Sequence, residues 1–112
     1  MNEASADKQR GWRLSREQNV LALEIVLLER TYILPWSQFL YAEGGDDQVR
    51  LVFATHDVIA KGAGLGALLS EMTTQRLTGL DEPSRADRIV HRDGEGIREL
   101  SVHRVGEDRD VR

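Results

Sequence analysis

Apolar residues are concentrated between positions 20 and 69, and their spacing changes along that stretch. Val49, Leu51 and Phe53 alternate with Arg50, Val52 and Ala54, which is typical of a β-strand with two different faces. Before this strand, glycine and aspartate at 44–47 form a strong hairpin-loop signal, because glycine allows positive φ and aspartate bonds its own backbone. The pattern predicts strands at 39–43, 49–54 and 58–60, joined as two hairpins with the second turn at 55–57.

Residues 16–30 fit two interpretations. Ser15 with Gln18 has the spacing of a helix capping box, and Leu21, Ile25 and Leu28 would then share one helical face. Alternatively, residues 20–28 form a nearly continuous apolar run, as expected of a strand covered on both faces. We favour the strand, followed by a turn and a short strand at 31–34 that Pro35 ends. An amphipathic helix remains the alternative.

Beyond Gly62 and Gly64 the apolar spacing becomes helical. Leucine or methionine at positions 65, 68, 69, 72 and 77 predicts an amphipathic helix near 65–77. Residues 81–96 are polar and contain Pro83, which predicts a long polar loop. Alternation resumes at Ile97 and predicts a closing strand near 97–104.

These elements predict an α+β domain over residues 15–105. We expect a small antiparallel β-meander or half-open barrel of about five to six strands, with the one helix packed across it. Residues 1–14 and 106–112 lack apolar periodicity and are predicted to be a mobile N-terminal tail and a frayed C-terminal tail. The predicted core consists of Ile25, Leu27, Ile33, Phe39, Leu51, Phe53, Val58, Leu65, Leu68, Leu69 and Leu100.

Composition excludes several classes of function but does not identify one. The 112 residues are 40% hydrophobic and 30% charged, with a net charge of −4, as in an ordinary small globular domain. The absence of cysteine excludes disulfides, thiolate zinc sites and cysteine nucleophiles. No apolar run approaches the roughly 20 residues that span a bilayer, and the N-terminus does not resemble a secretory signal. We therefore expect a cytoplasmic protein without a membrane partner.

The glycine cluster is the most suggestive motif. Gly62-x-Gly64-x-x-Ala67 follows a predicted strand and opens a predicted helix, and Asp81 lies about 20 residues further on, as in a dinucleotide-binding fingerprint. The simpler interpretation is a strand-to-helix turn. We favour the turn, because too little chain remains for a doubly wound sheet.

Other titratable residues give weaker signals. His56 and Asp57 suggest an oriented general base, but neighbouring turn residues usually point apart. His91 and His103 lack the spacing of a metal site, and Asp46-Asp47 lacks the further oxygen ligands of a calcium loop. We predict no catalytic constellation, no metal and no cofactor.

Arginines are frequent in the second half of the chain, where acidic residues are interleaved with them. Part of the chain is similar to the opening of LytTR-type DNA-binding domains: residues 33–35, 39–43 and 49–51, then Gly62 with Leu65 and Leu68. That resemblance implies DNA binding, although the acidic net charge disfavours nucleic acid. The nucleic-acid contacts would be Arg88, Arg92, Arg98 and Arg104.

Three hypotheses for function follow. The first is a non-enzymatic interaction module that self-associates or binds a protein partner. A strand that is apolar on both faces needs a second cover, so the predicted self-association surface comprises Val20, Ala22, Val26 and Leu28. The second is a nucleic-acid-binding module, and the third is an enzyme with a nucleotide at Gly62–Ala67.

Overall fold

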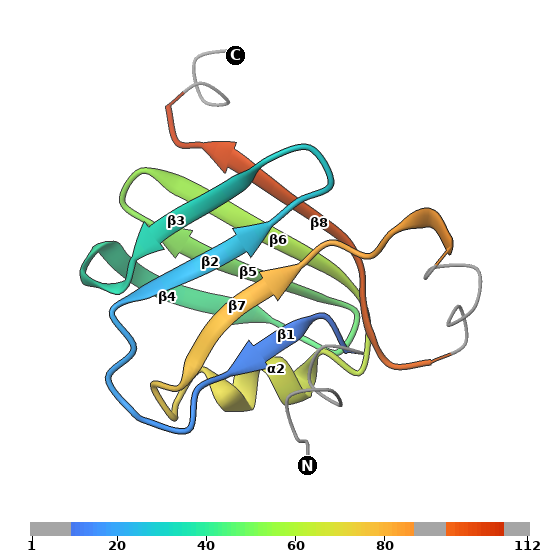
Figure 1. Ribbon diagram of the computed structural model, residues 1–112, viewed down its shortest axis with the longest axis horizontal. Coiled ribbons are helices and arrows are strands. Elements are labelled where there is room, and N and C mark those ends of the chain that lie inside the picture. The colour runs from blue at the N-terminus through green and yellow to red at the C-terminus, as the bar shows by residue number, and fades with distance from the viewer. Residues whose placement is uncertain (1–9, 87–93, 107–112) are drawn as a thin grey trace.

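The computed structural model describes residues 10–86 and 94–106, and strands make up 52% of it. Two four-stranded sheets form two layers whose strands cross one another, with one short helix at the lower end (Figure 1). The structure is therefore mostly β, without a closed barrel, and it has more strands than the five or six predicted. The elements are β1 (Trp12–Leu14), β2 (Ala22–Val26), β3 (Thr31–Pro35), η1 (Trp36–Gln38), β4 (Phe39–Gly44), β5 (Gln48–Phe53), β6 (His56–Ala63), α2 (Gly66–Glu71), β7 (Leu77–Asp81) and β8 (Gly96–Arg104).

The second sheet, ordered β4-β5-β6-β8, is the predicted antiparallel meander. Its hairpins turn at 45–47 and 54–55, so β6 begins two residues earlier than predicted. The register between β6 and β8 shifts between Lys61 and Gly62. This shift lets both Ile97 and Leu100 become buried, at 6% and 5% exposure, where simple alternation would place them on opposite faces.

The first sheet, ordered β1-β7-β2-β3, was only partly predicted. β2 confirms the strand interpretation of residues 20–28, and it pairs antiparallel with β3. β7 then lies between β1 and β2, antiparallel to the first and parallel to the second, so this sheet is mixed. The parallel pairing joins residues that are more than 50 positions apart, such as Glu24 and Gly79.

Three predicted boundaries are wrong because β1 and β7 were not recognised. The predicted N-terminal tail ends in β1, whose Trp12 is 1% exposed, while residues 1–9 lie outside the described part. The predicted helix near 65–77 ends at Glu71, because the chain turns and enters β7 at Leu77. The predicted loop at 81–96 begins with residues held by the sheet: Asp81 N–H donates to Gly11 O at 2.8 Å. Residues 87–93 and 107–112 lie outside the described part.

The core fills the space between the sheets. Of the predicted core, Leu27, Phe39 and Leu69 are only partly buried. Ile33 is 59% exposed, because the β2–β3 register places it opposite Glu24 on the outer face and turns Leu34 inward. Seven predicted core members are confirmed as buried: Ile25, Leu51, Phe53, Val58, Leu65, Leu68 and Leu100. The buried residues that were not predicted include Trp12, Leu23 and Leu80.

The glycine cluster is a place where two chain segments approach closely. A Cβ on Gly62 would overlap the Gly96 carbonyl oxygen of the neighbouring strand. Gly62 N–H also donates to Asp47 O at 3.0 Å, and Leu65 N–H donates to Asp46 O at 2.8 Å. The cluster therefore attaches the β4–β5 hairpin to the start of α2, as the turn interpretation requires.

We predict that Gly62→Ala lowers the free energy of unfolding by about 1–3 kcal/mol, because backbone atoms must move to admit the methyl group. Urea unfolding followed by circular dichroism measures this change. Gly45→Ala is the matched control, since no atom lies within 4 Å of the Cβ it would add. Equal stability of the two variants would contradict the close approach at Gly62.

Candidate functional site

Three segments that are distant in sequence line an apolar groove; their backbones come together at the left of Figure 1. They are the loop before β2, the η1 turn with the start of β4, and the segment from α2 to β7. The groove has a volume of about 450 Å³, and none of the nine described residues that line it is charged. The lining consists of Asn19, Val20, Leu21, Trp36, Ser37, Phe39, Met72, Gln75 and Leu77.

Aromatic rings give the groove a fixed wall. The Trp36 ring contacts Phe39 edge-on, with centroids 5.1 Å apart, and it lies 5.5 Å from the ring of the buried Phe53. Trp36 Nε1–H donates to Leu77 O at 3.3 Å, which connects η1 with β7. Because the indole is held by both packing and a hydrogen bond, the wall is formed before any ligand arrives.

Two non-glycine residues with left-handed backbone lie on the groove. Asn19 has φ 63° and Gln75 has φ 61°, and Val20 N–H donates to Gln75 O at 3.4 Å between their two loops. Such backbone is uncommon outside glycine, although asparagine adopts it more readily than most residues. The fold therefore maintains a small amount of strain at the opening, which is a frequent property of binding sites.

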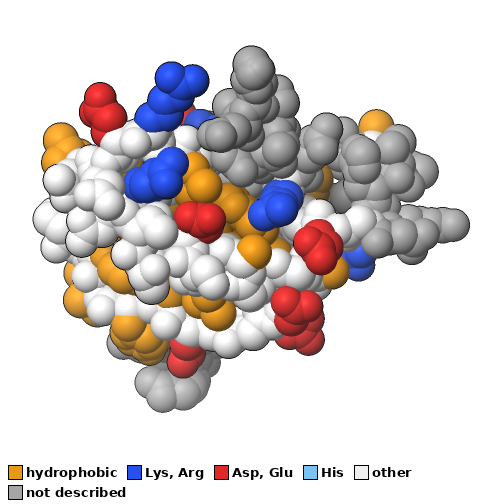
Figure 2. Space-filling view, turned by 90° about the horizontal axis from the view of Figure 1, so that it is seen from below, with side chains coloured by type: hydrophobic (Ala, Val, Ile, Leu, Met, Phe, Trp, Pro, Cys, Tyr) orange, Lys and Arg blue, Asp and Glu red, His pale blue; other side chains and the backbone are white. Residues whose placement is uncertain are grey.

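The surrounding surface differs from the groove in charge. Figure 2 views the molecule from the end that carries α2. Hydrophobic side chains reach the surface among uncharged atoms on the left of this view, whereas most charged side chains lie in its upper and right-hand parts. The chain has 30% charged residues, but the groove lining has none. Such a lining favours a neutral apolar ligand over a charged one.

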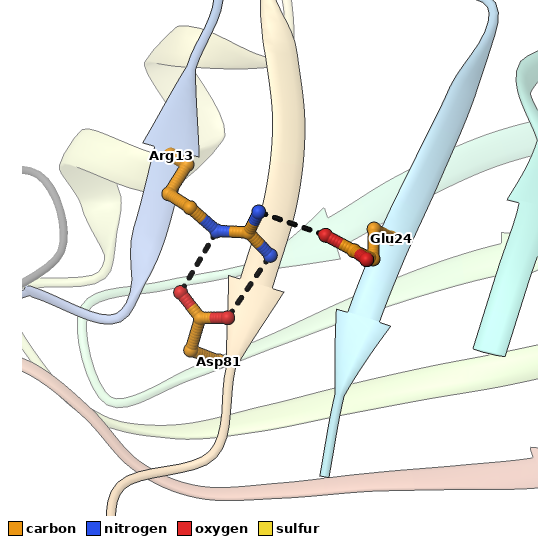
Figure 3. A network of polar contacts seen from close by, with 3 residues as sticks. All are labelled: Arg13, Glu24 and Asp81. Carbon is orange, nitrogen blue, oxygen red and sulfur yellow. Dashed lines mark hydrogen bonds and ion pairs between the residues drawn. The ribbon is translucent and has the colours of Figure 1, made fainter. Parts of the chain in front are cut away.

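A charged cluster on the outer face of the mixed sheet has a structural role instead. Arg13 donates to both carboxylate oxygens of Asp81 at 2.9 Å, and its Nη1 donates to Glu24 at 2.8 Å (Figure 3). The guanidinium lies across Gly79, where any Cβ would overlap it. Burial alone would lower the pKa of Arg13, but these hydrogen bonds and the two negative charges raise it. One side chain thus links β1, β7 and β2.

The antiparallel sheet carries a similar arrangement. Arg50 Nη2 donates to Asp57 Oδ2 at 2.9 Å and Nη1 donates to Glu43 Oε2 at 3.4 Å, which links β5 with β6 and β4. The hydrogen bond that Arg50 donates to Asp57 is the main reason why the pKa of Arg50 is raised. A second hollow of about 460 Å³ beside Glu43 and Arg50 is polar, and its arginine is already engaged in these ion pairs.

His56 and Asp57, which suggested a general base but were not predicted to form one, have separate partners. His56 contacts Thr55 Oγ1 through Nδ1 at 2.8 Å and packs edge-on against Tyr32, whereas Asp57 pairs with Arg50. His103 Nε2 lies 3.1 Å from Ser101 Oγ. Among the described residues, no group of three or more potential metal ligands lies together.

The geometry of the Gly62–Ala67 turn does not fit a dinucleotide-binding site. Asp46 Oδ1 accepts a hydrogen bond from Gly66 N–H at 3.3 Å, so a carboxylate of this chain faces the start of α2, where a phosphate would bind. The preceding β6 is antiparallel to both of its neighbours, whereas the fingerprint requires a parallel βαβ unit. The nucleotide hypothesis therefore loses its geometric basis.

The predicted nucleic-acid contacts are only partly described. Arg88 and Arg92 lie outside the described residues. Arg98 donates to Gly94 O at 3.1 Å, and Arg104 is exposed at the end of β8. Nucleic-acid binding by these residues remains a prediction.

The predicted self-association surface is partly open. Val20, Ala22 and Val26 are partly buried, and Leu28 is 57% exposed at the β2–β3 hairpin. Of these four, only Val20 lines the groove. Sequence periodicity did not reveal the groove, because its walls come from three separate segments. The tendency of asparagine to adopt positive φ is a signal that could have indicated Asn19, but it was not used.

Comparisons with protein families, with curated proteins and with solved structures find no match. Within the described ranges, no helix has the length and apolar character needed to cross a membrane.

We predict that Arg13→Met lowers the free energy of unfolding by about 1–2 kcal/mol, because two carboxylates in the mixed sheet lose their charged partner. Urea unfolding measures the loss. Arg16→Met removes the same charge at an exposed loop position and should change stability by less than about 0.5 kcal/mol. Similar losses in both variants would show that the change in net charge lowers the stability, and not the loss of the hydrogen bonds that Arg13 makes.

Proposed function

We propose that this protein is a non-enzymatic interaction module whose groove binds a neutral, apolar segment of a protein partner. The observation that carries this proposal is the uncharged lining of a groove of about 450 Å³ in an otherwise highly charged chain. A groove of this size lies within the range of ligand sites and can receive one or two large side chains.

The arrangement also supports selectivity. Apolar walls from Trp36, Phe39 and Met72 favour aliphatic or aromatic side chains. The side chains of Asn19, Ser37 and Gln75 can exchange hydrogen bonds with the peptide groups of a bound segment. A charged ligand side chain would lose its hydration here without gaining an ionic partner from the lining.

We expect the capped peptide acetyl-Leu-Phe-Leu-amide to produce a saturable change in tryptophan emission. The chain has two tryptophans, and Trp12 is 1% exposed in the core, so a change on binding reports Trp36. The charged peptide acetyl-Glu-Phe-Glu-amide should bind at least tenfold more weakly, because its carboxylates must be desolvated.

Ser37→Glu should weaken binding of the neutral peptide at least tenfold by placing a charge on the groove. Gln38→Glu is the matched control, because Gln38 is also exposed but does not line the groove. Equal effects of the two substitutions, or no response to the neutral peptide, would reject the groove as the binding site. Binding of a random DNA duplex that collapses between about 50 and about 200 mM salt would favour the nucleic-acid alternative instead.

A further inference from the structure

Leu21 is an exposed side chain on an anchored backbone. Its side chain is 85% exposed, the highest value among the exposed large hydrophobic residues of the described structure. Its carbonyl oxygen accepts a hydrogen bond from Trp36 N–H at 2.9 Å, and the preceding Val20 bonds Gln75 across the groove. A single exposed leucine is ordinary in itself. This one stands on the rim of an uncharged groove, and its backbone is already ordered.

We propose that the apolar segment bound by the groove is supplied by a second copy of this chain, with Leu21 of each copy inserted into the groove of the other. The proposal rests on the proposed function of the groove and names its occupant. A protruding side chain and a receiving groove on the same patch make that patch self-complementary, which is the condition for a two-fold symmetric contact.

The dimensions agree with this exchange. An apolar cavity of about 150 Å³ already accommodates a benzene-sized group. The groove, at about 450 Å³, therefore has room for a leucine side chain with part of its neighbouring backbone. Because the Leu21 backbone is hydrogen-bonded before contact, burial of Leu21 restricts mainly its side chain and costs little backbone entropy.

Charge does not oppose contact at the groove. Each copy carries a net charge of −4, so two copies repel one another over much of their surface. The groove lining adds no charge to that repulsion. Asn19, Ser37 and Gln75 supply polar side chains that can exchange hydrogen bonds between identical copies.

Sedimentation velocity over a range of micromolar concentrations tests the proposal. The wild-type protein should show a concentration-dependent monomer–dimer equilibrium, and Leu21→Ser should raise its dissociation constant at least tenfold, because two buried leucines are lost per dimer. Leu28→Ser is the matched control: Leu28 is 57% exposed but does not line the groove, so this variant should dimerise like the wild type. Loss of the dimer in Leu28→Ser but not in Leu21→Ser would overturn the proposal in favour of the outer surface of β2.

Mixing two variants tests the exchange itself. Leu21→Ser lacks the inserted side chain but keeps an uncharged groove, whereas Ser37→Glu keeps Leu21 but has a charged groove. A mixture of the two should associate more tightly than either variant alone, because one of the two symmetric contacts is restored. A mixture as monomeric as its components would overturn the insertion of Leu21.

The two proposals can fail separately. A wild-type protein that stays monomeric while acetyl-Leu-Phe-Leu-amide still changes the Trp36 emission would overturn the second copy as occupant and leave the groove as a partner site. A dimer that persists in both Leu21→Ser and Ser37→Glu, without any peptide response, would overturn both.

Discussion

The insertion of β7 between β1 and β2 is the constraint on which the rest of the structure depends. β1 pairs only with β7 among the described strands, and β2 would have an open edge without it. A strand with neighbours on both sides has its backbone donors and acceptors satisfied within the sheet, so it can be buried. β7 is buried at Leu77, Gly79 and Leu80. The mixed sheet is thus completed by a five-residue segment that follows the antiparallel meander β4–β6.

The insertion of β7 determines both the charged cluster and the apolar groove of this half of the molecule. On the outer face, Gly79 leaves room for the Arg13 guanidinium, which pairs with one acid on β7 and one on β2. At the end where β7 begins, Leu77 meets Trp36 and the loop before β2, and the groove opens between them. The side chains of the charged cluster consequently pair with one another across the outer face of the sheet, whereas the apolar groove remains available to a ligand.

Sequence periodicity predicted the local parts of this fold and missed the non-local ones. The strands near 39–44 and 48–53 were recognised because alternation and glycine-rich turns are encoded within a few residues. β7 was assigned partly to the helix, since Leu77 continues a helical spacing and Gly79 resembles a helix end. Its strand conformation depends on partners at positions 12–14 and 24–26, which no local pattern indicates. The groove was missed for the same reason. The sequence shows that Leu21 is apolar, but it does not show that this side chain is exposed.

The pairing of β1 with β7 also has a consequence for the order in which the chain folds. Trp12 and Arg13 lie opposite Leu80 and Gly79. The first described strand therefore pairs with a segment 66 to 68 positions later in the chain. The hairpins of β4–β6, by contrast, close over short loops and need little of the remaining chain. On a ribosome, the meander is therefore expected to form first, while Trp12 stays exposed until β7 has emerged. The first strand of the described structure is thus among the last to be protected from water.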